Sequence, residues 1–130
     1  AAFQPDVGES LFSLTGNAPA PWINVLEDGR TLPDRAHGLA HGYADCDEAT
    51  RVACIDRLRP QVPRPFTEPI ERAAWHDIPS TYVICTQDAS LPPSVQRNVF
   101  APRATSSVEL DASHAPMHAQ PARVAALLAK

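Results

Sequence analysis

Two short apolar segments in the second half of the chain have the pattern of buried strands. Residues 82–85 read Tyr-Val-Ile-Cys, four consecutive apolar residues that favour extended structure. A second, shorter segment covers residues 106–111. Consecutive apolar positions, rather than alternating ones, are typical of a strand that is covered on both faces, as in a parallel sheet. We therefore predict strands over residues 80–86 and 106–111.

Helical patterns follow both predicted strands. One helix is expected after Pro92-Pro93 and ends before Pro102, and Pro121 is suited to the first turn of a final helix. Residues 80–130 therefore predict the order strand–helix–strand–helix. Such a crossover connection makes the two strands parallel, and the loops beyond the carboxyl ends of parallel strands are where α/β proteins build their sites.

The pattern before residue 78 is weaker. Residues 22–26 and 30–32 predict two short strands around a turn at 27–30. A helix is predicted over 45–59, with Asp45 or Asp47 as its cap and Pro60 at its end.

The flanking segments give further local predictions. Residues 60–69 are too rich in proline for a regular element. A short helix is predicted over 68–75, with Pro69 in its first turn. Residues 1–3 resemble the end of a buried strand, and residues 4–8 a turn.

Composition excludes several classes of function. A net charge of −4 argues against nucleic acid as the main partner, because phosphate binding needs a basic face. No apolar segment approaches the roughly 20 residues of a membrane span, and the first residues do not have the pattern of a signal peptide. Cys46 and Cys54 would lie too far apart along a helix for a disulfide, and Cys85 falls within a predicted strand. We therefore expect a reducing compartment, the cytoplasm.

Each predicted strand is followed by a residue that can carry acid–base chemistry. Asp88 follows the first strand and His114 the second, so a parallel arrangement would bring both to one edge of the sheet. A carboxylate beside a histidine fixes its tautomer and stabilises its protonated form, so that the histidine can act as a general base. The order acid then histidine, late in an α/β pattern, is that of hydrolases whose nucleophile comes earlier in the chain.

These stretches resemble the C-terminal part of the α/β-hydrolase superfamily. The resemblance rests on Ile-Pro-Ser-Thr-Tyr-Val at 78–83, on Gln87-Asp88 with Leu91-Pro92, and on Leu-Asp-Ala-Ser-His-Ala-Pro-Met at 110–117. Residues 2–10 are also similar to this superfamily, where a core strand leads into the cap. The match is closest to the esterase branch that includes methylesterases and hydroxynitrile lyases. The resemblance implies that Asp88 is the acid and His114 the base of a catalytic triad, with no cofactor.

Two departures from the family pattern bear on activity. The chain has no G-x-S-x-G, and neither Ser10 nor Ser113 falls on a predicted strand-to-helix elbow. The segment that supplies the family's oxyanion donors is also missing. In addition, Ala115 stands where the lyases of this branch carry a lysine, which favours ester hydrolysis over cyanohydrin chemistry. We therefore expect that a small carboxylic ester is hydrolysed by a serine outside this chain, and that the 130 residues alone are inactive.

The resemblance also implies a division of the chain. Residues 1–8 would end a core strand and turn, residues 9–77 would form a mainly helical cap, and residues 78–130 would be the C-terminal α/β core. Two or three parallel strands leave exposed edges and little to pack against, so the sheet would be incomplete on its own. We expect this chain to pair with the missing N-terminal half of a hydrolase or with a second copy of itself.

Other residues have alternative interpretations. Trp22, Phe66 and Trp75 are candidates for substrate contact beneath the cap, although apolar cap residues more often only pack. His37 and His41 have the spacing of metal ligands on a helix, but the family needs no metal and the two glycines nearby weaken a helix. A non-catalytic α/β module that binds a small apolar ligand or a protein is the rival hypothesis.

Overall fold

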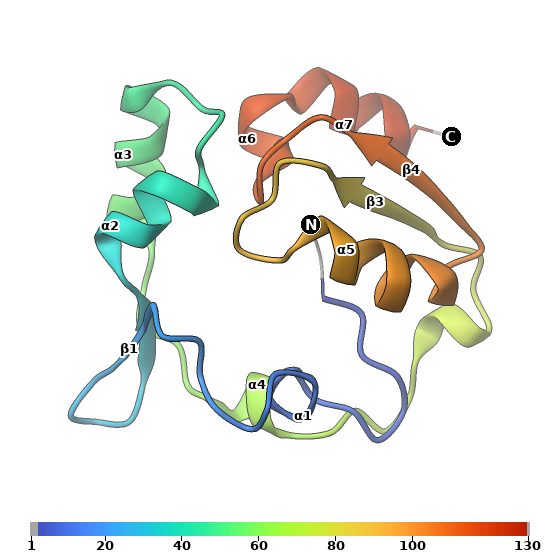
Figure 1. Ribbon diagram of the computed structural model, residues 1–130, viewed down its shortest axis with the longest axis horizontal. Helices are drawn as coiled ribbons and strands as arrows, with labels where there is room; N and C mark the ends of the chain where they lie inside the picture. Colours follow the sequence, from blue (N-terminus) through green and yellow to red (C-terminus); the bar gives the residue numbers. More distant parts are fainter. Residues whose placement is uncertain (1–2, 130) are drawn as a thin grey trace.

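The C-terminal half is built around two parallel strands. The computed structural model describes residues 3–129 (Figure 1). Strand β3 (Thr81–Cys85) pairs in parallel with β4 (Ser106–Leu110), in a register that runs from Thr81 opposite Ser106 to Cys85 opposite Leu110. Both predicted strands and their parallel pairing are therefore confirmed.

Helices cover both faces of this strand pair. On one face, Tyr82 and Ile84 pack against Phe100. On the other face, Cys85 and Leu110 form a buried cluster, and the partly buried Val124 packs against it. The first helical layer is α5 (Pro93–Val95), which continues into a π-helical turn η3 (Gln96–Phe100) and a 3-10 turn η4 (Ala101–Arg103); the second is α7 (Pro121–Leu128) (Figure 1). Because both faces are covered, apolar residues are needed at consecutive positions of β3.

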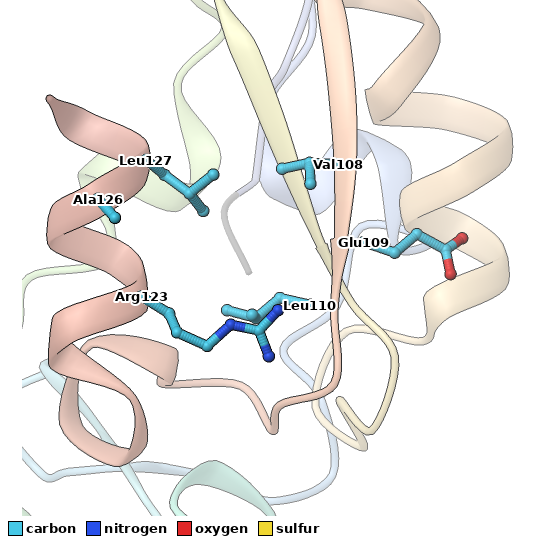
Figure 2. A pocket seen from close by; sticks show the side chains of 6 residues that line it. All are labelled: Val108, Glu109, Leu110, Arg123, Ala126 and Leu127. Carbon is cyan, nitrogen blue, oxygen red and sulfur yellow. The ribbon is translucent and has the colours of Figure 1, made fainter. Parts of the chain in front are cut away.

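Successive side chains of β4 point to opposite faces of the strand pair. Figure 2 shows Val108 and Leu110 directed toward α7, with Leu127 opposite them, whereas Glu109 points away from α7. On that other face the Glu109 carboxylate accepts a hydrogen bond from Nε of Arg97 at 2.7 Å. An exposed ion pair therefore replaces apolar packing at this position of the sheet edge.

The final helix is preceded by a turn of helix that sequence reasoning missed. Helix α6 (Pro116–Ala119) begins only two residues after His114, and α7 follows at Pro121 as expected. Both helices start on a proline, which lacks the N–H that a first helical turn leaves unpaired. These two prolines fix where the segment after β4 turns back over the sheet.

The hairpin predicted before residue 34 is confirmed. Strands β1 (Ile23–Val25) and β2 (Thr31–Pro33) are antiparallel, and the main-chain N–H of Leu26 donates to the carbonyl of Arg30 at 2.8 Å. Gly29 has a φ of +79°, in the left-handed region that glycine adopts without strain. Among residues 3–129 this hairpin and the β3–β4 pair are separate two-stranded sheets, so the sheet is incomplete, as expected.

The helical part of the 9–77 segment comes next. Helix α2 (Arg35–His37) continues into a π-helical turn η1 (Gly38–Gly42), and α3 (Glu48–Arg57) follows within the predicted range 45–59. Of the two candidate caps, Asp47 is the residue that caps α3, since its carboxylate accepts from the N–H of Thr50 at 2.9 Å. Figure 1 shows α2 and α3 lying side by side, apart from the strand pair.

Two predictions between residues 60 and 76 are wrong. The helix expected over 68–75 is absent from the described structure; instead α4 (Arg64–Thr67) lies inside the proline-rich stretch and a 3-10 turn η2 covers Ala74–His76. Proline is tolerated in the first turn of α4, where its missing N–H costs nothing. The N–H of Ile70 donates to the carbonyl of Glu9 at 3.0 Å, and this pairing holds the residues after Pro69 extended.

The start of the described chain is irregular. The strand end predicted over residues 1–3 falls largely outside the described residues, and Phe3 itself is not in a strand; its ring packs edge-on against Phe100 at 5.1 Å. Helix α1 (Leu11–Leu14) follows, with Ser10 as its cap. The N–H of Gly8 donates to the carbonyl of Ile70, so the two ends of the 9–77 segment lie side by side.

Candidate functional site

The loops that follow β3 and β4 bring Asp88 and His114 into contact. Nδ1 of His114 lies 2.9 Å from Oδ2 and 3.1 Å from Oδ1 of Asp88, although 26 residues separate them in sequence. The Asp88 side chain is fully buried, whereas that of His114 is 40% exposed. Nδ1 therefore faces the carboxylate, which is the ring nitrogen that the acid of a Ser-His-Asp triad orients, while Nε2 is the nitrogen that exchanges protons with the nucleophile in such a triad.

Asp88 is held in place by its own loop. Its Oδ1 accepts hydrogen bonds from the main-chain N–H groups of Ser90 and Leu91, both at 2.8 Å. Burial raises the pKa of this carboxyl, but the hydrogen bonds from His114 and from the Leu91 N–H outweigh burial, so that the pKa lies below its ordinary value of 3.8. Asp88 is therefore ionised at neutral pH and can orient and stabilise a protonated histidine.

Gln96 holds the loop that carries Asp88 through hydrogen bonds of its side chain. The sequence alone assigns this residue no role in catalysis. Its side chain is fully buried; Nε2 donates to Oδ2 of Asp88 at 3.2 Å and to the carbonyl of Leu91 at 2.6 Å. Its Oε1 accepts from the N–H of Cys85 at 2.8 Å. Gln96 thus links the last residue of β3 to the loop that carries the acid. A polar amide on the apolar face of a helix was the signal in the sequence that could have identified it.

Asp45 is a second residue that the sequence did not connect with this site. Its Oδ2 accepts the main-chain N–H of Ser113 at 2.8 Å, and its Oδ1 accepts the Ser113 hydroxyl. Ser113 is fully buried and directly precedes His114. Because the Ser113 hydroxyl donates its hydrogen bond to Asp45, this side chain has a structural role. Nothing local in the sequence pairs residues that are 68 positions apart.

A hollow of about 220 Å³ lies beside His114. Trp22 stacks on His37 in its wall, with ring centroids 4.4 Å apart and planes within 5°. The lining is mostly apolar or aromatic, with His114 and Ser90 contributed by the C-terminal half: Trp22, Pro33, His37, Gly38, Gly42, Tyr43, Ile55, Leu58, Ser90 and His114. The candidate base therefore faces a small, mostly apolar space formed by the 9–77 segment.

Of the three aromatic residues predicted to contact substrate, Trp22 is the one that lines this hollow. Phe66 lies in α4 and Trp75 in the turn η2; both are half-buried and neither lines the hollow. Trp75 has a buried Nε1 with no hydrogen-bond partner among the described residues. Substrate contact by these three side chains stays a prediction.

The serines of the described chain are placed differently. Ser10 is buried and caps α1, where its hydroxyl accepts from the N–H of Ser13 at 3.1 Å. Ser113 is bound to Asp45, as described above. Ser90 lines the hollow together with His114, but it belongs to the loop that holds the acid. None of the three sits on a strand-to-helix elbow of the G-x-S-x-G type.

The histidines proposed as metal ligands pack against each other. The rings of His37 and His41 are 4.5 Å apart, and burial followed by the charge of His41 lowers the pKa of His37. Among residues 3–129, no group of three or more histidine, cysteine or acidic side chains is placed to hold a metal ion. Nothing in this part of the chain therefore supports the metal alternative.

The described helices also include none that could cross a membrane.

Comparison with known proteins identifies the fold. The family model described as "Alpha/beta hydrolase family" matches residues 2–127. No curated protein sequence matches the chain. A pyrethroid hydrolase from Sphingobium faniae JZ-2 superposes with a TM-score of 0.70 at 23% identity, over 97% of this chain and 56% of that one. Polyneuridine aldehyde esterase superposes with a TM-score of 0.74 at 16% identity, over 96% and 57%. The chain thus spans a little over half the length of these solved structures.

Proposed function

The chain belongs to the alpha/beta hydrolase family, and on that premise we propose that it carries the acid and the base of a serine esterase whose nucleophile lies outside residues 1–130. The observation that carries this proposal is the contact of 2.9 Å between Nδ1 of His114 and the buried, ionised carboxylate of Asp88. The absence of G-x-S-x-G from the 130 residues supports the placing of the serine elsewhere.

The proposed reaction follows from the roles of these two side chains. Nε2 of His114 takes the proton of the serine hydroxyl as the oxygen attacks the ester carbonyl, and Asp88 stabilises the protonated ring. His114 then gives the proton to the leaving alcohol. A water molecule, deprotonated by the same histidine, hydrolyses the acyl-enzyme. Residues 1–130 alone are inactive in this proposal, because no nucleophile completes the triad.

The hollow beside His114 supports a small, uncharged ester as the substrate. Its volume of about 220 Å³ is below the roughly 300–1,000 Å³ of a pocket for a drug-sized ligand. The stacked rings of Trp22 and His37 offer a flat surface, and burial lowers the pKa of His37, which keeps this wall uncharged at neutral pH. The 9–77 segment is thereby proposed to act as a cap that recognises the acyl or alcohol group.

The proposed partner is the half of a hydrolase that supplies the serine. The pair β3–β4 is a two-stranded sheet, and a further strand beside β3 would cover its open edge. A second copy of the chain would cover the same edge but would bring no G-x-S-x-G. Complementation by an N-terminal half is therefore favoured over self-association.

The test compares ester turnover by residues 1–130 with turnover by the protein from the complete reading frame that contains them. We expect no turnover of 4-nitrophenyl acetate by the 130 residues, and turnover by the complete protein that H114A abolishes. D88N should lower kcat on the order of 10⁴-fold, because the histidine is then held in the wrong tautomer. A complete protein that binds such compounds without hydrolysing them would contradict the proposal and favour the binding-module rival.

A further inference from the structure

The Asp45 carboxylate joins the loop that carries His114 to the 9–77 segment. Asp45, which lies between η1 and α3, accepts both donors of Ser113, the main-chain N–H at 2.8 Å and the hydroxyl. Ser113 is the residue before His114 and is fully buried. A carboxylate that binds two donors of one residue restrains both the position and the rotation of that stretch of main chain.

A second contact joins the same two segments on the other side of the histidine. The ring of Tyr43 lies edge-on to that of His118 in α6, with centroids 5.7 Å apart. Tyr43 also lines the hollow beside His114. The cap turn, which we define as residues 43–46, therefore contacts the histidine loop one residue before His114 and four residues after it.

The cap turn is itself fixed by its main chain. The N–H of Cys46 donates to the carbonyl of Tyr43 at 3.1 Å, and Asp47 begins α3 as its cap. Cys46 is buried. The Asp45 carboxylate is therefore presented from a short, ordered turn. Asp88 holds the ring of His114, whereas Asp45 holds the main chain that carries it.

We propose that Asp45 is a positioning residue, which acts through Ser113 to fix His114 and thereby couples the placement of the 9–77 segment to catalysis. The part that concerns catalysis rests on the proposed function. A substrate that binds in the hollow and contacts Trp22 and Tyr43 would stabilise the cap turn, which in turn holds the histidine loop. Loss of the carboxylate would leave Ser113 with two unpaired donors and would let His114 drift from Asp88.

The direct readout is the nuclear magnetic resonance signal of the His114 Nδ1 proton, which is shared with Asp88. In residues 1–130 we expect this proton to give a distinct downfield signal that D45A broadens or abolishes. S113A, which keeps the main-chain N–H bond to Asp45, should have a smaller effect in the same direction. The matched control is D47N, since Asp47 lies two residues away and bonds Thr50 rather than the histidine loop.

The kinetic readout uses the complete protein. We expect D45A to lower kcat on the order of 10- to 100-fold with little change in KM, S113A to fall between D45A and the unmodified protein, and D47N to match the unmodified protein.

An unchanged Nδ1 signal and unchanged kcat in D45A would overturn the proposal; if D45A does not fold, the same result in the milder S113A would do so. Signals that change as expected in a protein without ester turnover would uphold the positioning role and overturn the proposed function instead.

Discussion

Nδ1 of His114 lies 2.9 Å from Oδ2 of Asp88, and the two residues reach each other from loops at the ends of adjacent parallel strands. The buried carboxylate is stabilised in its ionised form by His114 and by the N–H of Leu91. This contact therefore contributes to stability as well as to the proposed chemistry, and the two contributions can be tested separately.

The stability of the chain should depend on the ionisation of Asp88. Because the pKa of Asp88 in the folded chain is below 3.8, its contribution is present above that pH and is lost as the pH falls through the folded value. We expect D88N to lower the free energy of unfolding by about 1–3 kcal/mol at pH 7. This gap between the unmodified chain and D88N should narrow below pH 4, where the Asp88 carboxylate becomes protonated. Urea unfolding over a pH series measures this. The exposed Asp77 supplies the control D77N, and a gap of equal size at pH 7 and pH 3 would contradict the account.

The side chain of Gln96 should contribute far more to the free energy of unfolding than that of its exposed neighbour Arg97. Q96L leaves the N–H of Cys85 and the carbonyl of Leu91 without their partner and should cost roughly 2–4 kcal/mol in the free energy of unfolding. R97A removes only the exposed pair with Glu109 and should cost less than about 1 kcal/mol. Equal losses in urea unfolding would show that the buried amide network is not what holds the acid loop.

Gly38 allows the turn η1 to approach α3. A Cβ at this position would overlap Cδ1 of the buried Ile55, so G38A should cost about 1–3 kcal/mol. I55V removes that methyl group and should cost about 0.5–1.5 kcal/mol by itself. The double variant should therefore be more stable than the sum of the two losses predicts. G42A is the control, because a Cβ at Gly42 meets nothing within 4 Å; strict additivity would rule out the close approach.

The two tryptophans should respond differently to a small aromatic ester. Trp22 lines the hollow beside His114, whereas Trp75 does not. Titration of residues 1–130 with benzyl acetate should shift the indole N–H resonance of Trp22 and the ring resonances of His114, and leave that of Trp75 in place. W75F assigns the two indole signals. A shift confined to Trp75 would move the substrate site away from the hollow.

The C-terminal half could be predicted because its signals are local. Apolar residues at consecutive positions of β3 reflect a strand covered on both faces, and prolines mark the starts of α5 and α7. Parallel pairing then follows from the crossover, which is why Asp88 and His114 were expected at one edge.

The segments that could not be predicted depend on distant partners. The helix expected over 68–75 fails because Ile70 pairs with the main chain of Glu9, which a local pattern does not contain. Gln96 was not recognised as a support of the acid, because its amide is matched to Cys85 and Leu91 only in the folded chain. The sequence offers Asp45 and Asp47 as alternative caps of the helix over 45–59; Asp47 is the cap, and the Asp45 carboxylate binds Ser113, 68 residues further on.

The most direct test of the central claim is the site of covalent labelling by a serine-directed fluorophosphonate in the complete protein, mapped by mass spectrometry of its peptides. We expect one labelled serine, within a G-x-S-x-G that lies outside residues 1–130, and loss of that label in H114A. A label on Ser90, Ser113 or any other serine of residues 1–130, or labelling that persists in H114A, would contradict it.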